Sequence, residues 1–334
     1  MSVAGEVLAV RRTAGVFRLS GRALLEVHGS DRVRFLQGQL SNDVAKLDPS
    51  GPHSGCYAFA LTREGRIVAD FHVVVRPDSF WLETAAMALP TAIARLEKFV
   101  IADDVQIADR SAAFARFAVE GPRAPELVAT AAGAALQIAA ECAVSTQISG
   151  VEAVVGAWGS SGEAAFQIFA ASEHTAAVEA ALRGAGDACG AIFASEVALE
   201  VLRVEAGKPR WGAELGEHTL PAELRLVDRA ISFTKGCYTG QEVVARMQSR
   251  GRVGHLLVGV ALEGDVLPAT GAAIEANGAR VGELTSVARS PSAGTIALGF
   301  VRRGFEAPAT ALEVGGRAAR VVALPFVAPG APPS

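Results

Sequence analysis

One short stretch, residues 233–246, combines a cysteine and a lysine with a predicted helix start. Thr239 and Glu242 are spaced three apart, which predicts a capping box at the N-terminus of a helix. Cys237 would then lie about two residues before that helix, with Lys235 beside it. The positive end of the helix dipole and a neighbouring cation both favour thiolate over thiol. The spacing predicts that Cys237 is a reactive thiol of undefined role, and an inert loop cysteine is the alternative.

A second stretch, residues 202–212, carries a carboxylate and an indole at the end of another predicted helix. Glu205 comes just before Gly207, where that helix should end, so its carboxylate could point into a cleft. Two carboxylate oxygens can accept paired N–H donors from a heterocycle that bears an amino group. Trp211 is a candidate for lining the same cleft. The alternative for Glu205 is an ordinary solvated helix-end glutamate.

Composition and charge limit the possible functions. The chain has 334 residues, half of them apolar and a fifth charged, with a net charge of −4. This balance predicts a globular protein of two or three domains and argues against direct nucleic-acid binding or attraction to a membrane. One local basic cluster is formed by Lys235, Arg246, Arg250 and Arg252. The four cysteines lie far apart, so no resident metal site is predicted.

The chain carries no sign of export or membrane insertion. Residues 1–12 lack a basic start followed by an apolar run. The most continuous apolar stretch, residues 131–144, is too short to span a bilayer. Low cysteine use fits a reducing compartment. We therefore expect a cytoplasmic protein without a membrane span.

The hydrophobic patterns predict an α+β fold with adjacent antiparallel strands. In an N-terminal domain of residues 1–110, strands at 16–19 and 24–27 are joined by Ser20-Gly21, and residues 56–62 and 66–75 form a hairpin. A central domain of residues 111–250 contains a helix that runs from about residue 125 into the alanine-rich segment. The boundary between these two domains could be discontinuous.

The C-terminal part has a different pattern. Residues 251–327 are short apolar runs separated by turn residues, which predicts an all-β domain. Asn277-Gly278 predicts a two-residue hairpin turn. The proline-rich tail, residues 328–334, is expected to be disordered.

Two motifs resemble a known family. Residues 235–242, Lys-Gly-Cys-Tyr-Thr-Gly-Gln-Glu, resemble the signature of the YgfZ family, relatives of the glycine-cleavage T-protein. Residues 202–207 match the Leu-Arg-x-Glu-Ala-Gly segment of the T-protein, whose glutamate holds the pterin ring of folate. The resemblance implies a T-protein-like ring of two antiparallel-sheet α+β domains and a C-terminal β-barrel. It also implies that Glu205 is the pterin anchor.

Two further segments are similar to family segments. Residues 65–70 resemble a hairpin motif, Gly-Gly-x-x-Asp-Asp/Glu, whose first aspartate assists aminomethyl transfer. Ala69 occupies that first position here, and Asp70 the second. Alanine cannot accept a proton or stabilise an iminium-like cation, so ordinary aminomethyltransferase activity is not expected. Asn42 and Asp43 lie in a segment that resembles one near the folate cleft, and helix-end capping is their alternative.

The resemblance implies a folate-binding accessory protein for iron–sulfur cluster assembly or repair. Its ligand would be tetrahydrofolate or a one-carbon derivative. Its partners would be client iron–sulfur proteins, including transfer-RNA-modifying enzymes, or cluster-assembly factors. The basic cluster would bind the glutamyl tail or an anionic partner. The alternatives are a tetrahydrofolate-dependent aminomethyl or one-carbon transferase, and a scaffold that binds only protein.

Overall fold

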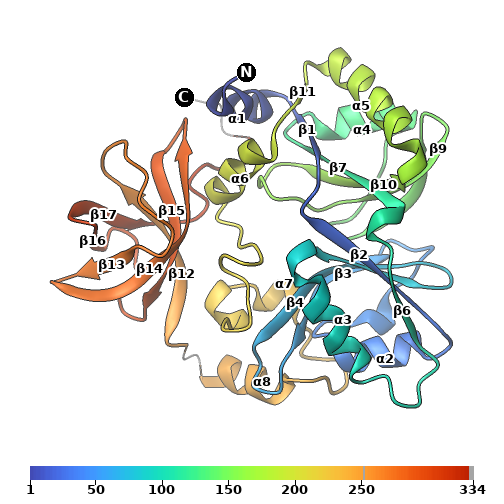
Figure 1. Cartoon of the computed structure of the whole chain (residues 1–334), viewed down its shortest axis with the longest axis horizontal. Helices are drawn as coiled ribbons and strands as arrows, with labels where there is room; N and C mark the ends of the chain where they lie inside the picture. Colours follow the sequence, from blue (N-terminus) through green and yellow to red (C-terminus); the bar gives the residue numbers. More distant parts are fainter. Residues whose placement is uncertain (251–252, 331–334) are drawn as a thin grey trace.

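Three sheets organise the chain, which a computed structural model describes over residues 1–250 and 253–330, the side chains of 248–250 excepted. Two of the sheets carry helices and form α+β domains, and the third closes into a barrel. Figure 1 shows the barrel on one side, the two α+β domains on the other, and a connecting segment between them. The predicted fold class is confirmed.

The first α+β domain has a five-stranded antiparallel sheet of order β3-β4-β5-β2-β6. Helices α2 and α3 cover one face, where their apolar side chains share a core with the sheet. The elements are β2 (Arg22–His28), α2 (Arg32–Gln39), β3 (Gly55–Leu61), β4 (Ile67–Val75), β5 (Phe80–Ala85), α3 (Leu89–Glu97) and β6 (Gln106–Asp109). The predicted hairpin of β3 and β4 is confirmed, with Gly65 at φ +77 in its turn.

The second domain has a six-stranded sheet of order β11-β1-β7-β10-β9-β8. Its pairs are antiparallel except β1 with β11. Helices α4 and α5 pack against it. The elements are β1 (Gly15–Arg18), β7 (Phe114–Glu120), α4 (Ala124–Ala132), β8 (Ala143–Ile148), β9 (Val151–Gly156), β10 (Ala165–Ala171), α5 (Thr175–Cys189) and β11 (Ile192–Phe193).

The structure differs from the sequence analysis at the start of the chain and at α4. A helix, α1 (Val3–Arg12), precedes β1, and the sequence analysis did not predict it. Strands β1 and β2 follow each other in sequence but belong to different sheets. The N-terminal segment therefore belongs to the second domain, since apolar patterning does not say which sheet a strand joins. Helix α4 also stops early, because Gly133 takes a left-handed φ of +73.

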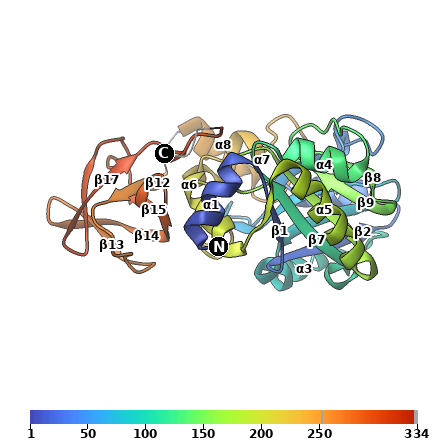
Figure 2. The same ribbon diagram turned by 90° about the horizontal axis from the view of Figure 1, so that it is seen from above.

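A connecting segment links the two α+β domains to the barrel. It contains α6 (Glu196–Glu205), α7 (Val227–Ala230) and α8 (Gln241–Arg250). Short 3₁₀ helices lie at Val44–Lys46, Ala86–Ala88, Ser111–Ala113, Ser172–His174 and Pro221–Leu224. Apolar residues of α1, α6, α7, both α+β domains and the barrel meet in one core cluster. Figure 2 shows α1 and α6 side by side between the barrel and the second domain.

The C-terminal barrel is closed, in the order β12-β15-β14-β13-β16-β17. Asn277 and Gly278 take φ values of +53 and +72 between β13 and β14, which confirms the predicted hairpin turn. The strands are β12 (His255–Leu262), β13 (Ala273–Ala276), β14 (Ala279–Ser290), β15 (Gly294–Arg302), β16 (Ala311–Val314) and β17 (Arg317–Val322). Of the tail expected to be disordered, residues 331–334 lie outside the described part. The backbone N–H of Gly330 donates to Glu163, 3.0 Å away.

Candidate functional site

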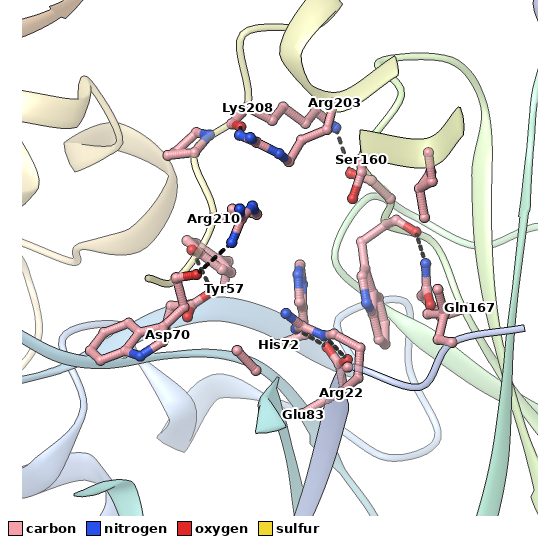
Figure 3. Close-up of a pocket in the computed structure, with 18 of the residues that line it drawn as sticks. Arg22, Tyr57, Asp70, His72, Glu83, Ser160, Gln167, Arg203, Lys208 and Arg210 are labelled. Carbon is pink, nitrogen blue, oxygen red and sulfur yellow. Dashed lines mark hydrogen bonds and ion pairs between the residues drawn. The ribbon is translucent and has the colours of Figure 1, made fainter. Parts of the chain in front are cut away.

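A cavity of about 370 Å³ lies where the two α+β domains meet the connecting segment. Strands β3, β4 and β5 form one wall, β7 and β10 another, and α6 with residues 208–211 a third. Figure 3 shows Asp70, His72 and Glu83 on one side of the cavity, with Arg203 and Lys208 across from them. This volume is typical of small-molecule sites.

Strand β4 supplies the polar side chains of the first wall by simple alternation. Asp70 and His72 line the cavity, whereas Ala69 and Phe71 are fully buried among the helices. Side chains two apart on a strand share a face, and neighbours face opposite sides. The expectation that Ala69 removes the acid from the site is therefore corrected. The position that reaches the cavity is 70, and it is an aspartate.

Asp70 is buried and only half satisfied. Its Oδ2 accepts a hydrogen bond of 3.0 Å from the hydroxyl of Tyr57. Burial and the nearby Asp70 raise the pKa of Tyr57, which keeps the hydroxyl protonated as a donor. Within the described residues Oδ1 has no partner, and neither does the indole N–H of Trp158, which also lines the cavity. Unpaired buried polar atoms are costly, so this pair points to a ligand that both donates and accepts.

Aromatic rings cover the wall beside Asp70. The rings of His72 and Trp158 are stacked, 4.8 Å apart and 9° from parallel. The guanidinium of Arg229 lies 4.2 Å from the centre of the Tyr57 ring. Such flat surfaces suit a planar heterocycle.

A carboxylate behind this wall fixes two of these side chains. Glu141 lies 2.7 Å from Nδ1 of His72 and accepts a hydrogen bond of 2.8 Å from Nε of Arg229. Burial would raise its pKa, but His72 and Arg229 outweigh burial and hold the pKa of Glu141 at about 2. Glu141 is thus an anion over the whole physiological range.

Cations and anions alternate around the rest of the cavity. Glu83 binds Arg22, with 2.6 Å between Oε2 and Nη2. Glu200 binds both Arg203 and Arg210, at 2.7 and 3.1 Å. Lys208 donates to the carbonyl of Gly159 at 2.7 Å, and burial lowers the pKa of its ammonium. The charges are mostly paired, so the cavity suits a polar ring system that carries no net charge itself.

Glu205 does not line this cavity. It is fully buried, its Oε2 accepts from Nη2 of Arg11 at 2.8 Å, and its Oε1 accepts from Ser290 at 2.6 Å. Both oxygens are occupied where α1, α6 and β14 meet, which argues against the prediction that Glu205 anchors a pterin. The carboxylates that α6 presents to the cavity are Glu196 and Glu200, earlier in the same helix.

Lys235 does not offer its charge to a ligand. Its ammonium is buried and donates to the carbonyls of Gln37, Leu40 and Asn42, at 2.7, 2.6 and 2.8 Å. It closes the C-terminal end of α2, where carbonyls lack helical partners. Burial lowers its pKa to about 8. Because these three carbonyls occupy its ammonium, Lys235 does not act with the other members of the basic cluster in binding an anion.

Asn42 and Asp43 follow α2, next to the Lys235 ammonium, and do not line the cavity. The Asn42 amide donates to the carbonyls of Tyr57 and Arg229, at 2.8 and 3.2 Å. Asp43 accepts from Gln37 at 2.8 Å. These contacts argue against their expected place in the folate cleft. The alternative, helix-end capping, is not observed for Asp43, whose side chain makes no capping hydrogen bond to the 3₁₀ helix Val44–Lys46.

The surroundings of Cys237 differ from the expectation. Helix α8 begins at Gln241, four residues after the thiol. Gly240 takes a left-handed φ of +87, and within the described part no hydrogen bond joins the Thr239 hydroxyl to Glu242, so the capping box is corrected. A Cβ at Gly240 would meet the Thr62 carbonyl at 2.6 Å, which explains the glycine by close packing on the β3–β4 turn.

Cys237 and Arg246 are exposed and lie outside the cavity lining. Of the other thiols, Cys142 and Cys189 are buried, and burial raises the pKa of Cys56 to about 12. The side chain of Arg250 and all of Arg252 lie outside the described residues. The basic cluster therefore has no demonstrated role in the cavity.

Trp211 is the predicted site residue that the structure does place in the cavity wall. The sequence analysis missed the residues of the opposite wall: Tyr57, Asp70, His72, Trp158 and Arg229. A signal for two of them was present, because Asp70 and His72 alternate with apolar residues in an otherwise apolar strand. In the described part of the chain, no cluster of potential metal ligands occurs and no helix is long and apolar enough to cross a membrane.

Two α+β domains and the connecting segment enclose a polar cavity of the size of small-molecule sites, and a closed barrel completes the fold. Residues 1–235 match the GCVT N-terminal domain, and residues 256–328 match the glycine cleavage T-protein C-terminal barrel domain. The chain belongs to the glycine cleavage T-protein family.

Named relatives of this chain agree with that family. It is 30% identical to the aminomethyltransferase of Streptomyces coelicolor, over 96% of this chain and 88% of that protein. It is 32% identical to that of Symbiobacterium thermophilum, over 97% and 89%. The crystal structure of the glycine cleavage system aminomethyltransferase T from Bartonella henselae is similar, with a TM-score of 0.86, 25% identity, and coverage of 98% of this chain and 90% of that one.

Proposed function

We propose that the chain is a tetrahydrofolate-dependent aminomethyl or one-carbon transferase that binds a reduced folate in the cavity. The observation that carries this proposal is Asp70, a buried carboxylate in the cavity wall with one oxygen unpaired. The similarity to aminomethyltransferases over nearly the whole chain supports it. The earlier expectation of an inactive site depended on Ala69, whose side chain faces the core.

The cavity residues fit a reduced pterin. A tetrahydropterin offers several N–H donors and one carbonyl acceptor, which complement the free oxygen of Asp70 and the free N–H of Trp158. When bound, tetrahydrofolate supplies the nucleophilic nitrogen that takes up the one-carbon unit. Asp70, held by Tyr57, would place a fixed negative charge against the positive charge that develops on the transferred carbon.

Calorimetry and a transfer assay test this proposal. Tetrahydrofolate should bind the wild type, and a one-carbon unit should pass to it from an aminomethylated carrier protein or a small methylamine. Asp70→Asn should lower that transfer, whereas Asp78→Asn, on the exposed turn between β4 and β5, should not. Absence of folate binding by the folded wild type would overturn the proposal.

A second candidate function is favoured by one observation, the exposure of Cys237 within its Lys-Gly-Cys motif. In this function the chain is a YgfZ-type cytoplasmic protein that binds folate and supports iron–sulfur enzymes, including those that modify transfer RNA. Alkylation mapped by mass spectrometry should then label Cys237 first. A Cys237→Ser strain should lose iron–sulfur enzyme activity while the purified variant still transfers one-carbon units. Unchanged iron–sulfur activity would exclude this candidate.

A further inference from the structure

His72, in the cavity wall, is held by the carboxylate of Glu141, and the proposed function gives this pair no role. Nδ1 of His72 lies 2.7 Å from Oε2 of Glu141, and both side chains are largely shielded from solvent. His72 lines the cavity, whereas Glu141 does not and lies behind it. A carboxylate on Nδ1 fixes the proton there and leaves Nε2 as the nitrogen that can accept one.

The second ring nitrogen, Nε2, belongs to a side chain that lines the cavity. No hydrogen bond to Nε2 occurs among the residues that the structure describes, and Nε2 points away from Glu141. His72 lies two residues after Asp70 on the same face of β4, opposite Tyr57 on β3 and Glu83 on β5. Figure 3 shows His72 and Asp70 on the same side of the cavity.

We propose that His72 is the general acid–base of this cavity, with Glu141 as the positioning residue that sets its tautomer. Nε2 accepts the proton that an attacking N–H loses as its new N–C bond forms. The imidazolium then returns that proton to the amine or thiolate whose bond to the carbon breaks. Proton and charge balance, and no further reactant is needed. The inference rests on the proposed function for its reaction, but the state of the histidine can be measured without turnover.

Charged side chains surround the His72 ring. The groups that face it are the anions Glu141, Asp70 and Glu83 and the cations Arg22 and Arg229, which bind Glu83 and Glu141 respectively. Removal of the Glu141 charge should therefore release the tautomer of His72. The stack on Trp158 keeps the ring plane fixed in either protonation state.

The decisive experiment is nitrogen-15 NMR of the histidines of the full chain as a function of pH. Neutral His72 should carry its proton on Nδ1, and addition of tetrahydrofolate should shift its Nε2 resonance. His174, an exposed histidine beside Glu173, serves as the control and should not respond. Glu141→Gln should release the tautomer, so that the Nδ1 and Nε2 resonances of His72 move toward each other. A neutral His72 with its proton on Nε2, or one that ignores folate, would overturn the proposal.

Kinetics supply the second readout. His72→Gln should lower kcat by about 10²- to 10⁴-fold and remove one limb of the pH–rate profile, with the KM for folate changed less than about threefold. A change confined to KM or to stability would show a structural role and overturn the proposal. Failure of the proposed function would appear differently, as no transfer by the wild type, and the NMR response to folate would then decide the role of His72.

Discussion

Among single residues, Asp70 and its neighbour Ala69 show how one strand position decides the chemistry. Asp70→Asn keeps the shape of the side chain but removes the charge, so we expect transfer to fall by about 10²- to 10³-fold with the fold intact. Ala69→Asp places a carboxylate among apolar side chains at a fully buried position, which should destabilise the protein by about 3–5 kcal/mol. Transfer rates and urea denaturation of both variants measure these effects. Restored or increased activity in Ala69→Asp would mean that the acid acts from the other face.

Glu141 gives the molecule a predictable response to acid. Its pKa is about 2 in the folded protein, below the ordinary value of 4.5. A carboxyl group with a lowered pKa stabilises the folded state above about pH 4.5, and this contribution is lost as the pH falls toward 2. We expect the stability difference between wild type and Glu141→Gln to shrink by about 1–3 kcal/mol between pH 5 and pH 3. Denaturation curves at fixed pH test this, and a constant difference would contradict it.

The residue scale also shows what the sequence could reveal. The polar residues Asp70 and His72 in an apolar strand were readable as one face of a sheet. The partner Glu141 was not, because it is 69 residues away from His72 and follows a loop rather than a periodic element. Glu205 matched a motif, but its buried partner Arg11 lies 194 residues earlier. Long-range pairing of charges is what local patterns leave undetermined.

At the scale of elements, Lys235 joins the loop before α8 to the end of α2. Lys235→Met would leave three carbonyl groups of that end without their donor, and we expect a loss of about 2–4 kcal/mol. Lys98→Met, at the exposed end of α3, should change stability by less than about 0.5 kcal/mol. Urea denaturation of both variants provides the measurement. Equal stabilities would show that water satisfies the three carbonyls.

Elements were predictable where local chemistry defines them. The hairpins of β3 with β4 and of β13 with β14 follow from glycine or Asn-Gly turns between apolar runs. The start of α8 was misplaced because Gly240 takes its left-handed conformation to approach the β3–β4 turn, a tertiary contact. The assignment of β1 to the second sheet likewise depends on partners far along the chain.

At the scale of the whole molecule, Arg11 holds the parts together. Its guanidinium binds Glu205 of α6 and Glu163 of the second domain, and Glu205 binds Ser290 of the barrel. Arg11→Met would leave two buried carboxylates without their cation, so we expect a loss of about 3–5 kcal/mol. Glu205→Gln should cost less, and folate affinity in the folded variant should change less than about threefold. Calorimetry showing a 30-fold loss of affinity in folded Glu205→Gln would return that residue to the ligand site.

The contacts among Arg11, Glu205 and Ser290 can form only in a fixed order while the chain is being synthesised. Arg11 leaves the ribosome early, but Ser290 follows 279 residues later, the difference of the two positions. At about 5–20 residues per second, the first helix waits roughly a quarter of a minute to a minute for its last partner. During that wait its apolar side chains, Val7 and Val10, have no α6 to cover them until residue 205 is made. These two side chains are therefore exposed on the nascent chain until α6 is made, and the buried hydrogen bond between Ser290 and Glu205 forms only later, when β14 is made.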